Sequence, residues 1–254
     1  MRYFKNIPAG SRVLMPMQRT YSQCPKCGKR LPQPLPEAAP CPFCGVYFFK
    51  WAAPTPPRIE KTTENALLAP LDEIGSTSFY GRVVAFVMLA SWSRVLFSYD
   101  YRDGEMGSSF MHLVLLPIHE AGHVFFMPFG SFMHILGGSL FQLLLPFGIG
   151  AAFFWKNRDN FAAALGMWWG GASLIDLSPY IYDSLHPQLI LLGGHAGEDG
   201  PHDWIYLLSA LGQLDNAQTW GAAAHLLGGL MMLSALAWAL AVLWKQRMKM
   251  KSSG

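Results

Sequence analysis

The stretch "LVLLPIHEAGHVFFMPFG", Leu113 to Gly130, decides the fold class, because three polar residues stand inside an otherwise apolar run. The full apolar segment, Phe110 to Phe129, has about the 20 residues that a membrane-spanning helix needs. Glu120 lies near its middle, between His119 and His123. A charge at the centre of a bilayer costs about 2.5 to 3.5 kcal/mol on insertion scales, so ionisable residues there are functional by default. The run therefore predicts a membrane helix that carries a functional site.

The composition of the whole chain supports a polytopic membrane protein. Of its 254 residues, 52% are apolar and only 14% are charged, whereas soluble domains carry about 25% charged residues. The net charge of +3 is too small to indicate a nucleic-acid partner, and we expect none. The N-terminus lacks the continuous apolar core and the cleavage site of a secretory signal peptide. Internal segments are therefore expected to insert into the lipid bilayer.

Five apolar segments approach the length of a membrane crossing, and a shorter apolar segment precedes the last of them. The five are 82–99, 110–129, 132–155, 161–182 and 219–244, and the shorter one is 203–214. The basic N-terminal region and the basic tail both belong in the cytoplasm by the positive-inside rule. This requires an even number of crossings, so either the short segment helps to make a sixth crossing or one long segment is re-entrant. We expect an α-helical polytopic membrane protein with five to six transmembrane helices, and we favour six.

The rest of the chain completes four expected regions. Residues 1–50 hold the basic N-terminus and a cysteine-rich module, and residues 51–80 form a linker rich in Pro and Thr. Residues 81–245 form the membrane-embedded domain, and residues 246–254 form a basic tail. The expected location is a bacterial inner membrane, with the cysteine-rich module and the tail in the cytoplasm.

Four cysteines in the first 44 residues form two Cys-x-x-Cys pairs, each followed by glycine. The pairs are Cys24 with Cys27 and Cys41 with Cys44. This spacing is typical of a four-thiolate zinc site, and "CPKCGK" and "CPFCGV" look like the two knuckles of a zinc ribbon. The alternative is a pair of disulfides, which would need an oxidising compartment. We expect one structural zinc ion here and a role in protein contact.

The motif from His119 to His123 has the pattern His-Glu-x-x-His. On a helix, residues four apart share one face, so the two imidazoles can hold one zinc ion. Glu120 can then reach a zinc-bound water, whose pKa zinc lowers to about 7. We expect Glu120 to take the proton of this water and to deliver it to a leaving amine. The alternative is a structural cluster of polar residues between helices.

A zinc hydrolase needs a third protein ligand and leaves one coordination position for water. By ligand type the candidates are Asp176, Asp183, His202 and Asp203. The last two stand together just before the short apolar segment, where Asp203 can orient a ligand imidazole or cap a helix. Gln142 can hydrogen-bond either a substrate strand or another helix. We therefore assign Gln142 and Asp203 to substrate contact or to the support of the ligands.

These motifs resemble the site-2 protease family of intramembrane zinc metalloproteases. The resemblance rests on "HEAGH" in an apolar helix, a following segment with Gly-Gly, and a distant helix end that carries aspartate. It covers roughly Phe110 to Asp183. The resemblance implies that His119, His123 and one downstream aspartate bind zinc, and that Glu120 is catalytic.

The family's aspartate lies in a Leu-Asp-Gly motif after a proline-rich turn. The nearest match is Asp183 after Pro179, although Ser184 stands where the family has glycine. The resemblance therefore makes Asp183 the preferred third ligand, with His202 and Asp176 as alternatives.

The expected function is that of a zinc-dependent intramembrane metalloprotease, with one catalytic and one structural zinc ion. Its substrate would be a membrane protein or a peptide, cut in or near the membrane. The alternative is a non-enzymatic membrane scaffold or a metal-responsive sensor in which both zinc sites are structural. The fourth coordination position separates the two functions, because a catalytic site leaves it open to a cavity and a structural site closes it with a fourth protein ligand.

Overall fold

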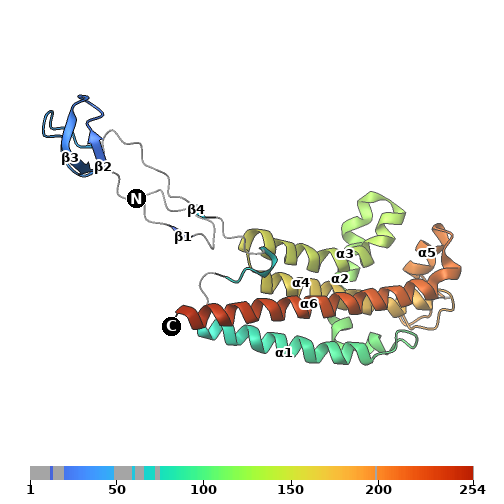
Figure 1. The fold of residues 1–254 in the computed structure, drawn as a ribbon. Coiled ribbons are helices and arrows are strands. Elements are labelled where there is room, and N and C mark those ends of the chain that lie inside the picture. The colour runs from blue at the N-terminus through green and yellow to red at the C-terminus, as the bar shows by residue number, and fades with distance from the viewer. Residues whose placement is uncertain are drawn as a thin grey trace. The chain divides into compact units, whose positions relative to one another are not determined.

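The computed structural model of the protein describes residues 12–13, 20–48, 59–60, 66–71, 75–197 and 199–253. The chain divides into two compact units, residues 1–64 and residues 65–254 (Figure 1). The boundary falls inside the expected linker, so the second half of that linker belongs to the second unit.

The first unit is a small β structure around the four cysteines. Strands β2 (Thr20–Gln23) and β3 (Arg30–Pro36) pair antiparallel, and so do β1 (Arg12–Val13) and β4 (Ile59–Glu60). Leu31 and Phe48 are buried together with Cys24 and Cys41, and Tyr21 stacks on Phe48 with ring centroids 5.0 Å apart. The apolar core formed by the described residues of this unit is small, and small domains of this kind often gain stability from a bound metal.

The described part of the second unit contains five long helices and one short helix. They are α1 (Ser76–Ser98), α2 (Phe110–Phe126), α3 (Ser131–Ala152), α4 (Asn160–Asp183), α5 (Asp203–Ala210) and α6 (Ala217–Ser253). Each long helix covers one of the five apolar segments of the sequence. Helix α5 has eight residues and a length of about 12 Å, less than half the thickness of the hydrocarbon core. By itself α5 is therefore too short to make the expected sixth crossing.

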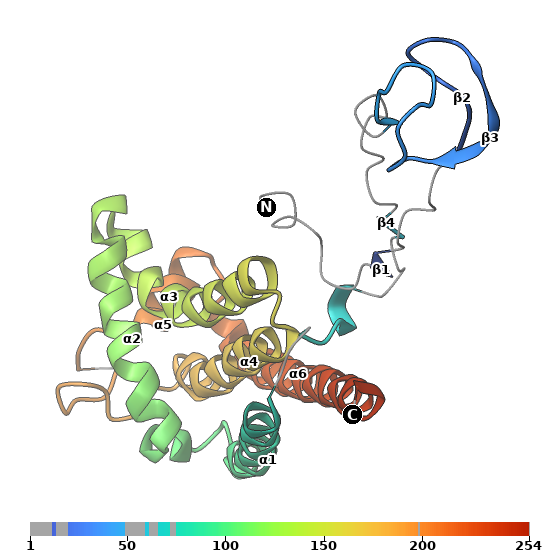
Figure 2. The ribbon, with the colours of Figure 1, turned by 90° about the vertical axis from the view of Figure 1, so that its left-hand side faces the viewer.

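Among the described residues, four helical segments are long and apolar enough to cross a membrane, and they contain α1, α2, α3 and α6. Helix α4 has 24 residues but is not one of the four. It lies in the middle of the bundle (Figure 2), and most of its residues are buried. Because its neighbours cover it, α4 can carry polar residues that a lipid-facing helix cannot. The count of five to six crossings stays a prediction.

The helices do not all run in the same direction. In Figure 2, α1, α3, α4 and α6 are seen nearly end-on, whereas α2 lies across them in the plane of the view. In Figure 1, α1 begins and α6 ends at the same end of the bundle. The short turn η2 (Ala66–Leu68) is held at that end, because Asn160 Nδ2 donates to Ala66 O at 2.9 Å and Trp238 Nε1 donates to Leu67 O at 2.6 Å.

Glycines allow the helix backbones to approach closely, as the paired glycines of the sequence suggest. A Cβ on Gly171 of α4 would lie 2.7 Å from the carbonyl oxygen of Gly228 on α6. A Cβ on Gly122 of α2 would meet the carbonyl of Gly137 on α3. These contacts hold α4 against α6 and α2 against α3. The polar residues of the bundle lie where α2, α3 and α4 meet.

Candidate metal centres

The four cysteines of the first unit lie close together as free thiols. Cys24 Sγ is 3.8 Å from Cys44 Sγ, and Cys27 Sγ is 3.9 Å from Cys41 Sγ. Four thiolates about 2.3 Å from a tetrahedral zinc ion would have sulfur atoms about 3.8 Å apart. The sulfur positions therefore fit a metal of that size and geometry.

The two knuckles have the same backbone conformation. Gly28 and Gly45 adopt φ angles of 71° and 73°, a left-handed conformation that glycine takes without steric cost. Their amides donate to the carbonyls of Cys24 and Cys41, each at 2.9 Å. The spacing Cys-x-x-Cys-Gly therefore folds into this turn for local reasons.

The electrostatics of the thiols also favour a bound cation. Burial raises the pKa of Cys24, but the backbone amides of Cys27 and Lys26 donate to its sulfur, and the pKa falls to about 6. The amide of Val46 lowers the pKa of Cys44, whereas burial and the other three sulfurs raise it to about 11. The Cys24 and Cys44 thiols therefore differ in acidity, and a cation between them would favour the ionised form of both.

In the second unit, four elements place polar side chains around one point. The two histidines of the motif lie one turn apart on α2, and α3 presents a face with a four-residue repeat. Helix α4 adds a similar face, and α5 adds its first residue. The contributing residues are His119 and His123 on α2, His134, Gly138 and Gln142 on α3, Asp176 and Tyr180 on α4, and Asp203 on α5.

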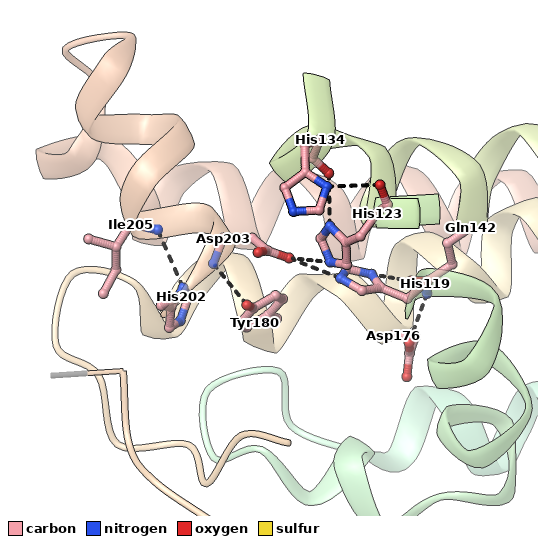
Figure 3. A network of polar contacts seen from close by, with 9 residues as sticks. All are labelled: His119, His123, His134, Gln142, Asp176, Tyr180, His202, Asp203 and Ile205. Carbon is pink, nitrogen blue, oxygen red and sulfur yellow. Dashed lines mark hydrogen bonds and ion pairs between the residues drawn. The ribbon is translucent and has the colours of Figure 1, made fainter. Parts of the chain in front are cut away.

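Three of these side chains converge on a single place. Asp203 Oδ2 lies 3.0 Å from His119 Nε2 and 3.2 Å from His123 Nε2 (Figure 3). Ligand atoms about 2.0 to 2.1 Å from a tetrahedral zinc ion would be about 3.3 to 3.4 Å apart. The two distances from the carboxylate oxygen to the imidazole nitrogens are therefore close to those in a metal-ligand set.

The other nitrogen of each imidazole determines where its proton lies. His123 Nδ1 is 2.9 Å from the carbonyl of His134, which only accepts, so Nδ1 carries the hydrogen. Gln142 Nε2 donates to Asp176 Oδ2 at 2.8 Å, which leaves Gln142 Oε1 as the acceptor for His119 Nδ1 at 3.0 Å. In its neutral form each imidazole therefore directs the lone pair of Nε2 toward the Asp203 carboxylate. Three acceptors directed at one place repel each other unless a cation or protons lie between them.

Glu120 lies beside this group. Its carboxylate and the two imidazoles offer ligand atoms that all lie within 4.8 Å of one another. These residues line a cavity of about 1110 Å³ whose walls also include Leu116, Ile135 and other apolar side chains. The arrangement combines a possible metal site, a free carboxylate and space for a ligand.

The structure does not bring Asp183, the preferred third ligand, to the two imidazoles. Its Oδ1 accepts hydrogen bonds from the amides of Gln188 and Leu189, at 2.8 and 3.2 Å, and its Oδ2 is 3.6 Å from His202 Nε2. Asp183 therefore fastens the loop that leads to α5. The position next to the two imidazoles, where Asp183 was expected, is occupied by Asp203. The sequence had predicted a supporting role for Asp203.

The two alternative ligands also have other partners. His202 Nδ1 accepts from the amide of Ile205 at 3.3 Å and so caps α5. Asp176 binds Gln142 through one oxygen and His112 Nδ1 through the other, at 2.9 Å. Gln142 links Asp176 to His119, a contact compatible with the predicted supporting role. His134, Gly138 and Tyr180 were not among the residues predicted for the site. The four-residue spacing of His134, Gly138 and Gln142 was a signal of a shared helix face.

Comparison with known proteins identifies no relative. No protein-family model, no curated protein and no solved structure matches this chain. The resemblance to site-2 proteases therefore depends on the sequence motifs of this chain alone.

Gly138 offers a test of the site geometry. A Cβ at this position would lie 2.5 Å from His119 Nε2 and 2.6 Å from His123 Nε2. We expect Gly138→Ala to displace both imidazoles and to weaken metal binding about 10- to 100-fold, as changes to the supports of a metal site do. Equilibrium dialysis against buffered zinc measures the effect. Gly148→Ala in the same helix is the control, because the added methyl group meets open space; equal zinc affinity for both variants would contradict the geometry.

Proposed function

We propose that this chain is a membrane-embedded zinc metallopeptidase that hydrolyses peptide bonds close to the bilayer. The observation that carries the proposal is the convergence of His119 Nε2, His123 Nε2 and Asp203 Oδ2 on one place beside the Glu120 carboxylate. Two imidazoles and one carboxylate, with a free carboxylate nearby, are the donor set of many zinc peptidases.

In this proposal His119, His123 and Asp203 hold the ion, so Asp203 takes the role that the sequence analysis gave to Asp183. When bound, zinc supplies hydroxide at neutral pH and polarises the substrate carbonyl. The hydrogen bonds of the two Nδ1 atoms to Gln142 and to the His134 carbonyl keep each imidazole in the tautomer that binds metal.

Glu120 acts as the general base and then as the general acid. It takes a proton from the attacking water and delivers it to the leaving amine. The apolar walls of the cavity, such as Leu116 and Ile135, hold an apolar peptide chain and keep lipid away from the reacting carbonyl. This fits the expected substrate, a membrane protein or a peptide.

The alternative function, a structural site in a scaffold or a sensor, needs a fourth protein ligand. The candidates for this position were Asp183 and His202, and these two side chains face each other. The site borders a cavity instead, which supports a fourth position open to water and substrate. The geometry therefore favours the enzyme over the scaffold.

The cysteine cluster is proposed to bind the second, structural zinc ion as a zinc ribbon. The two equal knuckles, the sulfur spacing and the small apolar core support this assignment. Its expected role is protein contact in the cytoplasm.

The direction of α2 supports a topology of four crossings, made by α1, α3, α4 and α6, with α2 lying across them. Both ends of this unit then face the cytoplasm, in agreement with the positive-inside rule. Helix α6 has 37 residues and a length of about 56 Å, so its basic end extends beyond the hydrocarbon core. Asp176 lies seven residues, about 10 Å, before the end of α4. The metal site is therefore placed near the outer surface of the membrane.

This topology predicts that green fluorescent protein fused to either terminus is fluorescent, because the fusion partner folds in the cytoplasm. An epitope inserted in the loop 100–108 should be reached by antibody from the outer face. Five crossings would place the two termini on opposite sides, so fluorescence from one fusion alone would contradict the proposal.

The proposed activity is tested by mapping protein N-termini in membranes of cells that make the chain and of cells that do not. New N-termini within about 10 residues of a transmembrane segment, the reach of an extended chain over about 33 Å, would support a membrane peptidase. Their absence at several expression levels would count against it.

A further inference from the structure

Tyr180 occupies a central position in the candidate site that no proposed role yet explains. It lies on α4, one turn after Asp176, and it lines the cavity. Its ring lies between His202 and His119, with centroids 4.3 Å and 6.2 Å away (Figure 3). Its Oη accepts a hydrogen bond from the backbone amide of Asp203 at 2.9 Å. Tyr180 is therefore fixed beside the proposed third ligand.

The hydrogen-bonding capacity of the hydroxyl is only partly used. A tyrosine hydroxyl has one donor hydrogen and two acceptor lone pairs. The amide of Asp203 is a donor, so it uses a lone pair of Tyr180 and leaves the hydrogen free. In the described part of the chain, Tyr180 Oη has no other hydrogen-bond partner. The hydroxyl hydrogen is therefore available to a ligand in the cavity.

We propose that Tyr180 is a catalytic residue that stabilises the oxyanion of the tetrahedral intermediate; this inference rests on the proposed peptidase function. In the attack, the water oxygen bonds to the carbonyl carbon, Glu120 takes one water proton, and the π electron pair moves to the carbonyl oxygen. Tyr180 keeps its proton and donates a hydrogen bond to that oxygen. The electron pair on the oxyanion then forms the C=O double bond again and the C–N bond breaks. Glu120 gives its proton to the nitrogen that leaves. The products are a carboxylic acid and an amine.

The surroundings of Tyr180 fit this role because they fix the donor before the charge develops. The Asp203 amide holds the oxygen, and the His202 ring packs against the aromatic ring. Preorganised donors of this kind account for about 100- to 1000-fold in rate when one is removed. An oxyanion donor binds the transition state and not the ground state, so it should also bind a tetrahedral analogue of that state.

The test measures the binding of a phosphinic peptide with leucine on both sides of the phosphorus, by calorimetry on the zinc-loaded protein in detergent. We expect Tyr180→Phe to bind it about 100-fold more weakly than the wild type, with an unchanged zinc content. Tyr182→Phe is the control, because Tyr182 is on the same helix but packs against Tyr101, with centroids 5.6 Å apart. This control should bind the phosphinic peptide as the wild type does.

The other possible outcomes of this binding experiment separate the role of Tyr180 from the proposed function. Equal binding by Tyr180→Phe and the wild type would overturn the role of Tyr180 and leave the peptidase proposal in place. Loss of zinc from Tyr180→Phe would show that the hydroxyl only positions Asp203, and would also overturn the inference. If the zinc-loaded wild type does not bind the phosphinic peptide, the proposed function itself fails and the role of Tyr180 fails with it.

Discussion

Replacement of Glu120 by glutamine should remove peptide hydrolysis while the zinc content of the protein stays at about two ions per chain. General acid–base groups contribute about 100- to 10,000-fold to a rate, and Glu120 is the carboxylate beside the two imidazoles. Glutamine keeps the shape of the side chain but cannot take a proton from water. Because Glu120 is not one of the proposed ligands, the ion should remain bound.

The measurement compares N-termini in membranes from cells that make the wild type or Glu120→Gln at equal levels. N-termini that depend on the wild type should disappear with the variant. Glu105→Gln is the matched control, because Glu105 is an exposed residue of the loop between α1 and α2, and this variant should cleave normally. Full cleavage by Glu120→Gln would rule out the general-base role, and loss of zinc from it would show that Glu120 is a ligand.

The parts of the structure that depend on nearby residues could be predicted from the sequence. The spacing Cys-x-x-Cys-Gly sets the turn at Gly28 and Gly45 through local hydrogen bonds. The spacing of His119 and His123 puts both on one side of a helix, because residues four apart share a helix face. The long helices follow from the apolar segments, because a chain in lipid must satisfy its backbone hydrogen bonds within each segment.

The third ligand position could not be predicted, because it depends on contacts between residues far apart in the chain. Asp183 and Asp203 are both aspartates near the end of a helix, and the family pattern favoured the first. The contacts of Asp183 with Gln188 and Leu189 direct it to its own loop. His202 caps α5 and leaves Asp203 as the first residue of that helix, facing α2. No residue spacing in the sequence specifies that the loop after α4 brings α5 back to α2.

In the proposed topology, the depth of Glu120 in the membrane does not follow from its place in the segment. A count of residues along the apolar segment places Glu120 at its centre. That count measures depth only for a helix that runs along the membrane normal, whereas α2 lies across α1, α3, α4 and α6. The free-energy cost of the Glu120 charge is then lowered by the polar groups of the cavity that Glu120 lines.

Replacement of Asp203 by asparagine should remove the zinc ion of the membrane unit and leave the ion of the cysteine cluster. Asparagine has no negative charge, and its NH2 group can donate to the Nε2 lone pairs of His119 and His123 that the ion would otherwise use. We expect the zinc affinity of this site to fall at least about 100-fold, the upper end of the range for residues that only support ligands. Zinc per chain, measured after dialysis, should fall from about two to about one, the number expected for a single four-thiolate site.

Two variants make this result specific to Asp203. Asp183→Asn should keep both ions, because the Asp183 carboxylate lies against His202 and the loop amides rather than the two imidazoles. The double variant Cys24→Ser/Cys27→Ser should lose the other ion and keep the one in the membrane unit. If Asp183→Asn lost the membrane ion and Asp203→Asn kept it, the family-based choice of ligand would be right and the arrangement of α5 against α2 would be wrong. Loss of both ions in either aspartate variant would mean that the two sites are not independent.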